Sequence, residues 1–365
     1  MPLRTGIVGL PNVGKSTLFN ALSRAKAETA NFPFCTIEPN IGIVTVPDER
    51  LNILTDLVKP KKTVPTTIEF VDIAGLVEGA SKGEGLGNHF LSHIRSVDAI
   101  IHVIRCFSDD NVAHIAGNID PVSDKEIIDT ELQLKDLETI EKRITKTDKI
   151  AKSGDLKANR EMDLYRKIQS HLEKGLNARS LLMEREELSL MKELSLLTSK
   201  PILYVANVDE ASIADGNGYV DRLKESIDDE DVQLIVVSAV IEEQIAELEN
   251  LEERTLFLKE YGLVESGLSK LIKAAYKLLN LITYFTASPK EVRAWTIVDG
   301  WKAPQAAGVI HSDFERGFIK VEMIRLSDYM QYKTEAKCKE AGKLAIEGKE
   351  YQVKDGDVMH FRFNV

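Results

Sequence analysis

The sequence has little cysteine and no apolar run long enough to cross a bilayer. Its three cysteines, Cys35, Cys106 and Cys338, are odd in number and far apart, which argues against a disulfide framework or a zinc knuckle. A membrane-spanning helix needs about 20 consecutive apolar residues, and the chain offers no such stretch. The N-terminal residues also lack the apolar core and small-residue cleavage site of a secretion signal. We therefore expect a cytoplasmic protein that makes no membrane contact.

Positive charge is also in short supply. The 47 Lys and Arg residues face 58 Asp and Glu residues, a formal net charge of -11. Such a charge repels a phosphate backbone at long range, so any contact with nucleic acid requires a local basic patch. Apolar residues make up 43% of the chain, which is enough for a folded core, and 365 residues exceed what one core usually serves. We expect two or three domains.

Short β-branched runs alternate with longer helical patterns between Thr5 and Val240. This alternation predicts an α/β fold, in which a mostly parallel sheet is covered by helices on both faces. The predicted strands are Thr5–Gly9, Ile41–Val46, Thr67–Ile73, Ala99–Cys106, Ile202–Val208 and Gln233–Ser238.

A highly charged segment, residues 124–200, interrupts this alternation. It holds sixteen acidic and sixteen basic residues among its 77, and its apolar residues recur at helical spacing. One series is Leu137, Ile140 and Ile144, and the other is Leu164, Ile168, Leu172 and Leu176. Because Ser153-Gly154-Asp155 supplies a turn between them, we predict an antiparallel helical hairpin. A solvated helix pair that merely fills an insertion is the alternative interpretation.

The pattern changes again after Tyr284, to short alternating runs separated by turn signals. The runs are Val292–Val298, Tyr351–Val353 and Val358–Phe363, and the turns are Asp299-Gly300, Glu347-Gly348 and Asp355-Gly356-Asp357. They predict a small mixed β domain at the end of the chain.

The strongest motif is a phosphate-binding loop, Gly9-Leu10-Pro11-Asn12-Val13-Gly14-Lys15-Ser16-Thr17, between a strand and an amphipathic helix. Glycines let backbone N–H groups converge on phosphate oxygens, and the helix N-terminus adds partial positive charge. Lys15 brings a full charge to the outer phosphates, and the hydroxyl of Ser16 suits Mg²⁺. We expect the phosphates to be bound by Asn12, Val13, Gly14, Lys15, Ser16 and Thr17.

A magnesium–phosphate site also needs a carboxylate at the end of a neighbouring strand. The run Phe70-Val71-Asp72-Ile73-Ala74-Gly75 supplies Asp72, and it places Gly75 where a backbone N–H can meet the terminal phosphate. Thr36 lies between the phosphate loop and Asp72, so its hydroxyl can close over the metal. Ser16, Thr36 and Asp72 are thus the predicted Mg²⁺ ligands. The glycines from Gly75 to Gly87 make this segment flexible, as expected of an element that becomes ordered around a bound triphosphate. A merely flexible surface loop is the competing interpretation.

Together these motifs resemble a translation-factor-type P-loop NTPase, and the longer strings resemble the Obg-like YchF ATPases. The strings are Gly6 to Thr17, Asp72-Ile73-Ala74-Gly75-Leu76-Val77 and Asn207-Val208-Asp209-Glu210. The similarity covers essentially the entire chain. It implies a nucleotide-binding domain of residues 1–123 and 201–280, a helical hairpin of residues 124–200 and a β-grasp TGS domain of residues 281–365. It further implies a slow ATPase that associates with the ribosome.

The base-binding residues are the least conventional part of the motif set. Where GTP-specific relatives have Asn-Lys-x-Asp, this chain has Asn207-Val208-Asp209-Glu210, and Glu210 is one methylene too long to reach guanine in the same geometry. Asn207 can both donate to and accept from the edge of adenine. Stereochemistry permits ATP without proving it, and the resemblance implies ATP. The predicted base site comprises Asn207, Val208, Glu210, Ser238 and Ala239.

Hydrolysis poses a second question, because Leu76 stands where Ras-like enzymes have the glutamine that orients water. Asn12 suggests one compensation, since in similar loops an asparagine helps to hold K⁺. His114 is our candidate for orienting the water, on the resemblance and on the chemistry of imidazole. His89 and His93 are the alternatives. Lys15, Gly75 and His114 are therefore the predicted catalytic groups.

Two functions remain open on the sequence alone. The first is a magnesium- and potassium-assisted ATPase, acting as a monomer, whose nucleotide state controls its docking on the ribosome. The second is a nucleotide-sensing binding protein in which hydrolysis is incidental. Contacts with RNA are a further possibility for the TGS domain, through basic and aromatic residues, namely Arg293, Trp295, Lys302, Arg316, Lys320 and Arg325.

Overall fold

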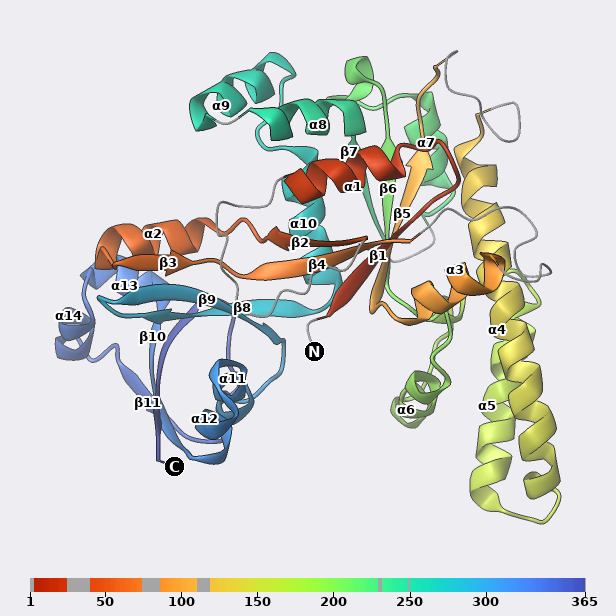
Figure 1. The fold of residues 1–365 in the computed structure, drawn as a ribbon. Coiled ribbons are helices and arrows are strands. Elements are labelled where there is room, and N and C mark those ends of the chain that lie inside the picture. The colour runs from red at the N-terminus through yellow and green to blue at the C-terminus, as the bar shows by residue number, and fades with distance from the viewer. Residues whose placement is uncertain are drawn as a thin grey trace. The chain divides into compact units, whose positions relative to one another are not determined.

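The computed structural model describes residues 3–24, 40–73, 86–109, 119–228, 232–248 and 250–364. These residues form two compact units. The first contains the chain up to Arg24 and most of Glu69–Lys270, and the second contains Ile43–Ile68 together with Leu271–Val365. Each unit is built around one six-stranded sheet (Figure 1).

The first sheet has the strand order β2-β4-β1-β5-β6-β7. Its strands are β1 (Arg4–Val8), β2 (Ile41–Thr45), β4 (Thr67–Asp72), β5 (Ala99–Arg105), β6 (Ile202–Asn207) and β7 (Gln233–Val237). The pairs β1–β4, β1–β5, β5–β6 and β6–β7 are all parallel. Each strand agrees with its predicted range to within one residue. The central strands β5 and β6 are buried along their full length, as strands covered on both faces must be.

Helices alternate with these strands along the chain, as the sequence pattern predicts, and the insertion of residues 124–200 adds further ones. They are α1 (Lys15–Arg24), α3 (Leu86–Arg95), α4 (Pro121–Ala151), α5 (Leu156–Leu172), α6 (Arg185–Leu194), α7 (Gly218–Glu225), α8 (Ala239–Glu247), α9 (Leu251–Glu260) and α10 (Gly267–Leu278), with short 3-10 turns η1 (Ala178–Ser180) and η2 (Glu210–Ser212). Helix α1 packs beside α8 (Figure 1). The α/β P-loop fold class predicted from the sequence is confirmed.

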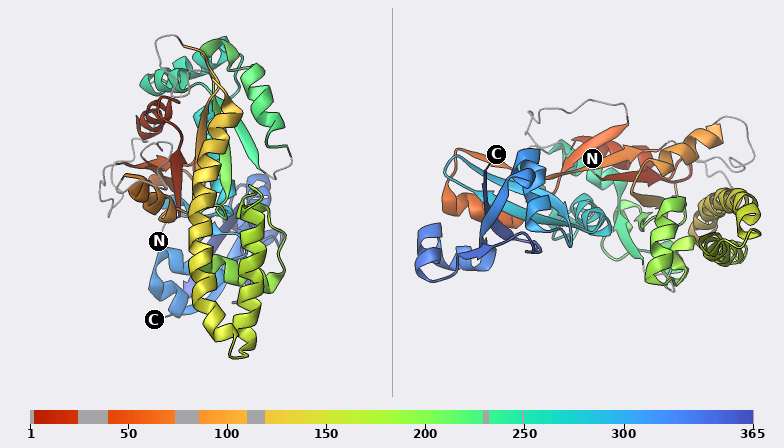
Figure 2. Two further views of the ribbon diagram at one scale, coloured as in Figure 1. Left: turned by 90° about the vertical axis from the view of Figure 1, so that its right-hand side faces the viewer. Right: turned by 90° about the horizontal axis from the view of Figure 1, so that it is seen from below.

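The charged insertion forms the predicted antiparallel hairpin, in which α4 and α5 lie side by side (Figure 2). Asp155 begins α5 by accepting a hydrogen bond from the Ala158 N–H at 2.8 Å. The seam between the helices buries apolar residues at helical spacing, among them Ile140, Leu164 and Ile168. One expectation is wrong. Leu176 does not extend the apolar stripe of α5, because the helix ends at Leu172 and Leu176 is exposed.

Buried charged groups hold the base of the hairpin against the sheet. In α4, Lys125 pairs with Asp129 at 3.0 Å, and the same carboxylate lies 3.7 Å from the guanidinium of Arg179. His102 on β5 is buried beside this pair, with its ring 5.6 Å from that of Tyr204. Further along α4, Asp136 accepts three hydrogen bonds from the segment after α6, from the Leu197 and Thr198 N–H groups and the Thr198 hydroxyl.

The second unit has a mixed sheet in the order β11-β10-β12-β8-β9-β3. Its strands are β3 (Lys62–Val64), β8 (Leu281–Ala287), β9 (Glu291–Val298), β10 (Phe318–Arg325), β11 (Ala345–Glu347) and β12 (Asp357–Phe363). The central pair β8–β12 is parallel, and antiparallel partners flank it. Leaving β3 aside, the strands follow the 2-1-5-3-4 order of a β-grasp fold. The helices of this unit are α2 (Glu49–Val58), α11 (Ala303–Ile310), α12 (Ser312–Arg316), α13 (Leu326–Tyr332) and α14 (Glu335–Glu340).

Sequence reasoning did not foresee that residues near position 55 join this C-terminal sheet. Strand β3 pairs in parallel with β9, and Leu51 and Leu54 of α2 are buried in one cluster with Phe285 and Val292. An amphipathic helix and a three-residue strand carry no sequence signal that identifies the elements they pack against.

The expected strand at Tyr351–Val353 is present only as an isolated antiparallel β-bridge between Gln352 and Lys302. The Ala303 N–H donates to Tyr351 O at 2.8 Å, and the Val353 N–H donates to Trp301 O at 3.0 Å. The turn glycines Gly300 and Gly356, by contrast, have positive φ angles of 91° and 88°, as the Asp-Gly signals predict. Among the described residues, no helix combines the length and apolar character needed to span a membrane.

Candidate nucleotide-binding site

Parallel pairing brings the phosphate loop and Asp72 to the same edge of the first sheet. Ile7 of β1 lies opposite Asp72 of β4, and both strands end there. The Ile73 N–H then donates to Ile7 O at 3.1 Å, which ties the end of β4 to the start of the loop. The carboxyl ends of neighbouring parallel strands form the usual ligand crevice of such sheets.

Close packing around two glycines fixes the shape of the loop. A Cβ on Gly9 would lie 2.6 Å from Val103 O, and one on Gly14 would lie 2.2 Å from Asn207 Nδ2. Gly14 also has a φ angle of 90°, and Asn12 has one of 63°. Larger side chains at either glycine would displace backbone or a buried amide, so the turn that gathers N–H groups before α1 depends on these glycines.

Lys15 and Asp72 meet in an ion pair, although they lie 57 positions apart in the sequence. Both side chains are largely shielded from solvent, with 10% and 18% of their areas exposed. The ammonium expected to bind phosphate and the carboxylate expected to bind Mg²⁺ therefore belong to one site. Ser16 lies beside Lys15 at the exposed start of α1. Hydroxyl and carboxylate oxygens are ligands that Mg²⁺ prefers, so this donor set fits the ion.

Asn207 ties three parts of the site together from the end of β6. Its amide Nδ2 donates to Val13 O at 2.8 Å, and its Oδ1 accepts from the Ala239 N–H at 2.9 Å. The residue is 4% exposed. The structure thus gives Asn207 a bracing role between the phosphate loop and the β7–α8 connection, which sequence reasoning missed when it considered only contacts with the base.

The two carboxylates that follow Asn207 have different surroundings. Asp209 accepts a hydrogen bond from the Ser212 N–H at 2.9 Å and so caps the short helix η2. Glu210 is the first residue of that helix and is exposed. Val208 is buried in the sheet. Ser238 precedes α8 and is fully buried, and its hydroxyl has no hydrogen-bond partner among the described residues.

Three predicted site residues, Thr36, Gly75 and His114, lie outside the described residues, as does Leu76. The remaining predicted residues lie at the ends of strands, in the phosphate loop, or at the helix starts that follow. They are Asn12 to Thr17, Asp72, Asn207, Val208, Glu210, Ser238 and Ala239. Of the alternative histidines, His93 is an exposed residue of α3.

Known proteins resemble this chain along its whole length. A family model named YchF-GTPase_C, described as a protein of unknown function, matches residues 281–364, and one named MMR_HSR1, described as a 50S ribosome-binding GTPase, matches residues 4–152. A protein of Bacillus subtilis called ribosome-binding ATPase YchF is 59% identical over 367 residues, with 100% of both chains covered. The chain belongs to the YchF family.

Other YchF proteins agree over the same length. The ribosome-binding ATPase YchF of Escherichia coli O157:H7 is 55% identical over 365 residues, again covering 100% of both chains. A solved structure, the YchF GTPase of Schizosaccharomyces pombe, is 41% identical and superposes with a TM-score of 0.90, covering 99% of this chain and 97% of that one. The resemblance inferred from the motifs is therefore confirmed.

The basic residues noted in the C-terminal part of this YchF chain are largely neutralised within its second unit. Lys302 pairs with Glu350, Arg316 pairs with Asp313, and Lys320 lies 3.9 Å from Glu322. Arg293 is stacked over the ring of Trp295 at 4.0 Å. This surface carries both signs of charge.

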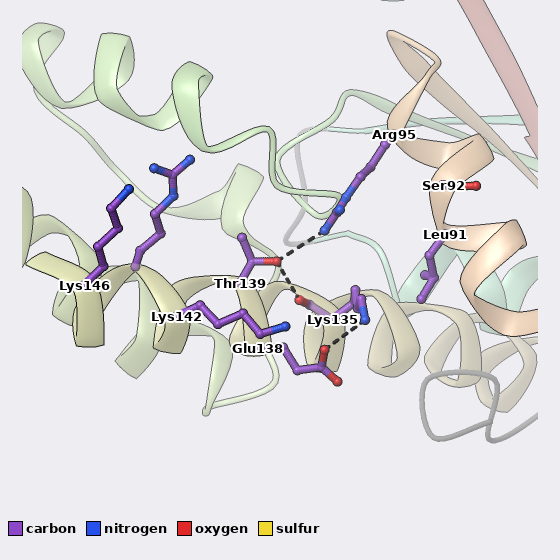
Figure 3. A pocket seen from close by; sticks show the side chains of 9 residues that line it. Leu91, Ser92, Arg95, Lys135, Glu138, Thr139, Lys142 and Lys146 are labelled. Atoms are coloured by element: carbon purple, nitrogen blue, oxygen red, sulfur yellow. Dashed lines mark hydrogen bonds and ion pairs between the residues drawn. The ribbon is translucent and has the colours of Figure 1, made fainter. Parts of the chain in front are cut away.

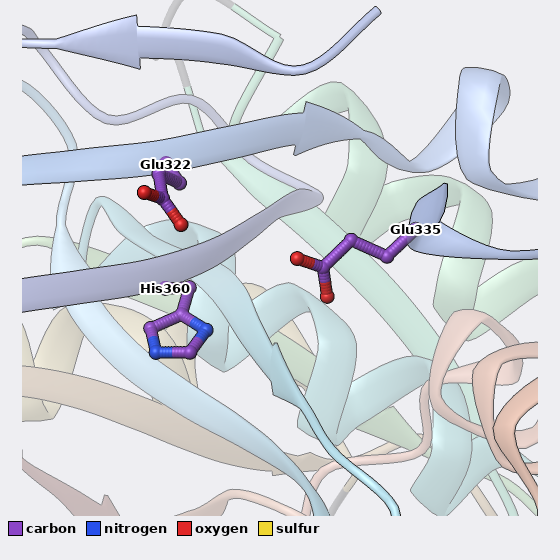
Figure 4. Close-up of side chains that lie close together, drawn as sticks. All are labelled: Glu322, Glu335 and His360. Atoms are coloured by element: carbon purple, nitrogen blue, oxygen red, sulfur yellow. The ribbon is translucent and has the colours of Figure 1, made fainter. Parts of the chain in front are cut away.

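One more group of potential ligands lies on the same sheet: Glu322, Glu335 and His360 converge from β10, α14 and β12 (Figure 4). Glu322 already accepts a hydrogen bond from Arg362 at 2.9 Å. The guanidinium of Arg362 therefore already offsets the charge of one of the three groups.

Proposed function

We propose that this YchF protein is a ribosome-binding ATPase that slowly hydrolyses ATP to ADP and whose nucleotide state controls its docking on the ribosome. The ion pair between Lys15 and Asp72, beside a phosphate loop braced by Asn207, is the observation that carries this proposal. The names of relatives that are 55% to 59% identical over the full chain support the same activity.

The two carboxylates after Asn207 permit ATP as the bound nucleotide, and the names of the full-length relatives support it. Asp209 is engaged as a helix cap, and Glu210 replaces the aspartate that reads guanine in GTP-specific relatives. A carboxylate facing the bare ring nitrogen of adenine would be repelled, so an exposed Glu210 that can turn away suits ATP. The proposed base site comprises Asn207, Val208, Glu210, Ser238 and Ala239. Competition between ATP and GTP for the purified protein tests this step, and equal affinities would contradict it.

The phosphates are assigned to Asn12 through Thr17, and Mg²⁺ to Ser16, Asp72 and Thr36. Held there, the ion would supply positive charge to the outer phosphates. Lys15 would offset the charge that develops there as the terminal phosphoryl group leaves, and the N–H of Gly75 is the proposed donor to one of its oxygens. Asn12 is the proposed ligand for K⁺, whose charge would add to that of Lys15.

His114 is the proposed group that orients the attacking water, since the aliphatic side chain of Leu76 forms no hydrogen bond. His114→Ala should lower turnover at least tenfold and leave ATP affinity unchanged, because the residue acts on water and not on the nucleotide. Single-turnover hydrolysis and ATP binding measured on the same preparation check this. Unchanged turnover would remove His114 from the mechanism.

Ribosome binding is tested by sedimentation with ribosomes in ADP and in a non-hydrolysable ATP analogue, together with steady-state turnover. Faster hydrolysis on ribosomes supports the ATPase switch. Nucleotide-dependent sedimentation with unaltered turnover would instead favour the second function, a binding protein in which hydrolysis is incidental. The proposal includes a monomeric state and a cytoplasmic location, where ribosomes are found.

A further inference from the structure

The three potential metal ligands on the C-terminal sheet come from three separate elements and meet on one face (Figure 4). Glu322 of β10 and His360 of β12 are directly opposite each other in the antiparallel pair, so their side chains lie on the same face. Glu335, in the first turn of α14, reaches the same place from a helix. One donor atom from each residue lies within 4.8 Å of the other two. Among the described residues, no other three histidine, cysteine or acidic side chains come this close.

Packing of α14 against the sheet fixes where Glu335 begins. Cys338 of α14 is fully buried in one cluster with Ile324 and Val358. These two residues lie two positions from the strand ligands on the same strands, and therefore on the same face of the sheet. The helix is thus anchored beside the two strand ligands. Glu335 itself is exposed, so it can still rotate about its side-chain bonds.

The same three side chains line a small cavity with a volume of about 20 Å³. A space of this size holds one water-sized particle. The other residues that line the cavity are mostly apolar, namely Ala287, Ile324, Tyr329, Leu344, Val358 and Met359. Apolar surroundings strengthen the attraction between a carboxylate and a cation, because they lower the local dielectric constant. The cavity therefore suits a single small ion.

The polar contacts of the three groups leave them able to bind a metal. Arg362 donates to Glu322 Oε2 at 2.9 Å, and Lys320 lies 3.9 Å from Glu322 Oε1. Each carboxylate oxygen has two lone pairs, so Glu322 can keep the bond from Arg362, which orients it as ligating carboxylates usually are. Glu335 and His360 form no hydrogen bond or ion pair with any residue that the structure describes. A carboxylate and an imidazole thus remain available beside Glu322.

The donor set indicates the class of ion. One imidazole nitrogen with two carboxylate oxygens suits Zn²⁺, whereas Ca²⁺ and Mg²⁺ are bound by oxygen ligands. Ligands at about 2.0–2.2 Å from a tetrahedral Zn²⁺ lie roughly 3.4 Å apart. The donors here, within 4.8 Å of one another, need only a small inward movement, which the exposed Glu335 permits. We propose that Glu322, Glu335 and His360 bind Zn²⁺, with water completing its coordination. This site shares no residue with the proposed ATPase site.

The test titrates the full-length, nucleotide-free protein with Zn²⁺ in a calorimeter, in excess Mg²⁺ to occupy oxygen-only sites. His360→Ala and Glu335→Gln are compared with Glu340→Gln, a control that changes another exposed glutamate of α14. Each site variant loses one of three protein ligands, so its affinity should fall at least tenfold, and the control should stay within twofold of the unsubstituted protein. Zn²⁺ should also raise the urea midpoint of the unsubstituted protein and not that of His360→Ala, because it binds the folded state. Without metal, all four proteins should unfold at the same urea concentration, since the substituted side chains are exposed.

Unchanged Zn²⁺ affinity in His360→Ala would overturn the inference. Losses of equal size in Glu340→Gln would do so as well, because they would indicate a diffuse attraction of Zn²⁺ to an acidic protein. Tighter binding of Ca²⁺ than of Zn²⁺ would show that the imidazole takes no part in binding. Thiolate-to-metal absorption in the Co²⁺-loaded protein would place the ion on a cysteine, and this result too would contradict the proposed site.

Discussion

Gly14→Ala provides the sharpest test of how the phosphate loop is built. At this residue φ is 90°, and an added Cβ would lie 2.2 Å from Asn207 Nδ2. Alanine costs about 1–2 kcal/mol in this backbone region. The displaced Asn207 would also lose its hydrogen bond to Val13 O, a contribution of about 0.5–1.5 kcal/mol.

The expected total is therefore about 1.5–3.5 kcal/mol, equivalent to roughly 10- to 300-fold in an equilibrium constant. If the free loop relaxes, the loss appears in ATP affinity. If the loop keeps its shape, the loss appears in the free energy of unfolding. Denaturant unfolding of the ATP-saturated protein records the sum of both, and calorimetric titration with ATP separates them.

Gly154→Ala is the matched control. Gly154 has a φ angle of 89° in the hairpin turn, and no atom lies within 4 Å of its added Cβ. It should lose only the backbone contribution of about 1–2 kcal/mol in unfolding free energy and nothing in ATP affinity. If Gly14→Ala behaves like Gly154→Ala in both measurements, the contact with Asn207 does not shape the loop and the reasoning fails.

Two further predictions concern the base of the hairpin. Burial lowers the pKa of His102 from 6.5 to about 4. Between these two pH values His102 is protonated in the unfolded chain and neutral in the folded protein, so the free energy of unfolding falls as the pH is lowered. Between pH 7 and pH 5, His102→Leu should lose about 2 kcal/mol less free energy of unfolding than the unsubstituted protein. Urea unfolding of both proteins at both pH values measures this difference, and equal losses in the two proteins would contradict the prediction. Asp136→Ala leaves three donors of Leu197 and Thr198 without their carboxylate and should cost about 3 kcal/mol or more. The control Asp148→Ala, on the exposed part of α4, should cost under about 0.5 kcal/mol. If thermal unfolding gave similar losses for the two variants, the hydrogen bonds to Asp136 would not stabilise the base of the hairpin.

The sheet of the first unit could be predicted from the sequence because its strands are continuous β-branched runs bounded by recognisable turns. β5 and β6 are buried along their whole length, and apolar residues fill most of their positions, with His102, Arg105 and Asn207 as the polar exceptions. The phosphate site was equally accessible, because glycine spacing and a strand-terminal aspartate report a local backbone shape and a strand end. Parallel pairing then brings Lys15 and Asp72 together.

Contacts between segments far apart in the chain could not be predicted from the sequence. Nothing in Lys62–Val64 names β9 as its partner, because backbone pairing is indifferent to side-chain identity. The bracing role of Asn207 depends on where Val13 O lies after folding. The net charge of residues 124–200 gives no sign of a local basic cluster. Residues 124–200 have equal numbers of both charges, and only the structure shows a groove between α3 and α4 lined by Lys142, Arg143 and Lys146, which form no ion pair with any described residue (Figure 3).

The pairing of β3 with the C-terminal sheet has a consequence for synthesis of the chain. Its partner β9 is translated about 230 residues later, a delay on the order of 10 to 45 s at about 5–20 residues per second. Leu51 and Leu54 must wait equally long for Phe285 and Val292. An isolated fragment that begins at residue 281 would expose one edge of its sheet and part of its apolar interior, so it should be produced together with residues 43–68 or as the intact polypeptide.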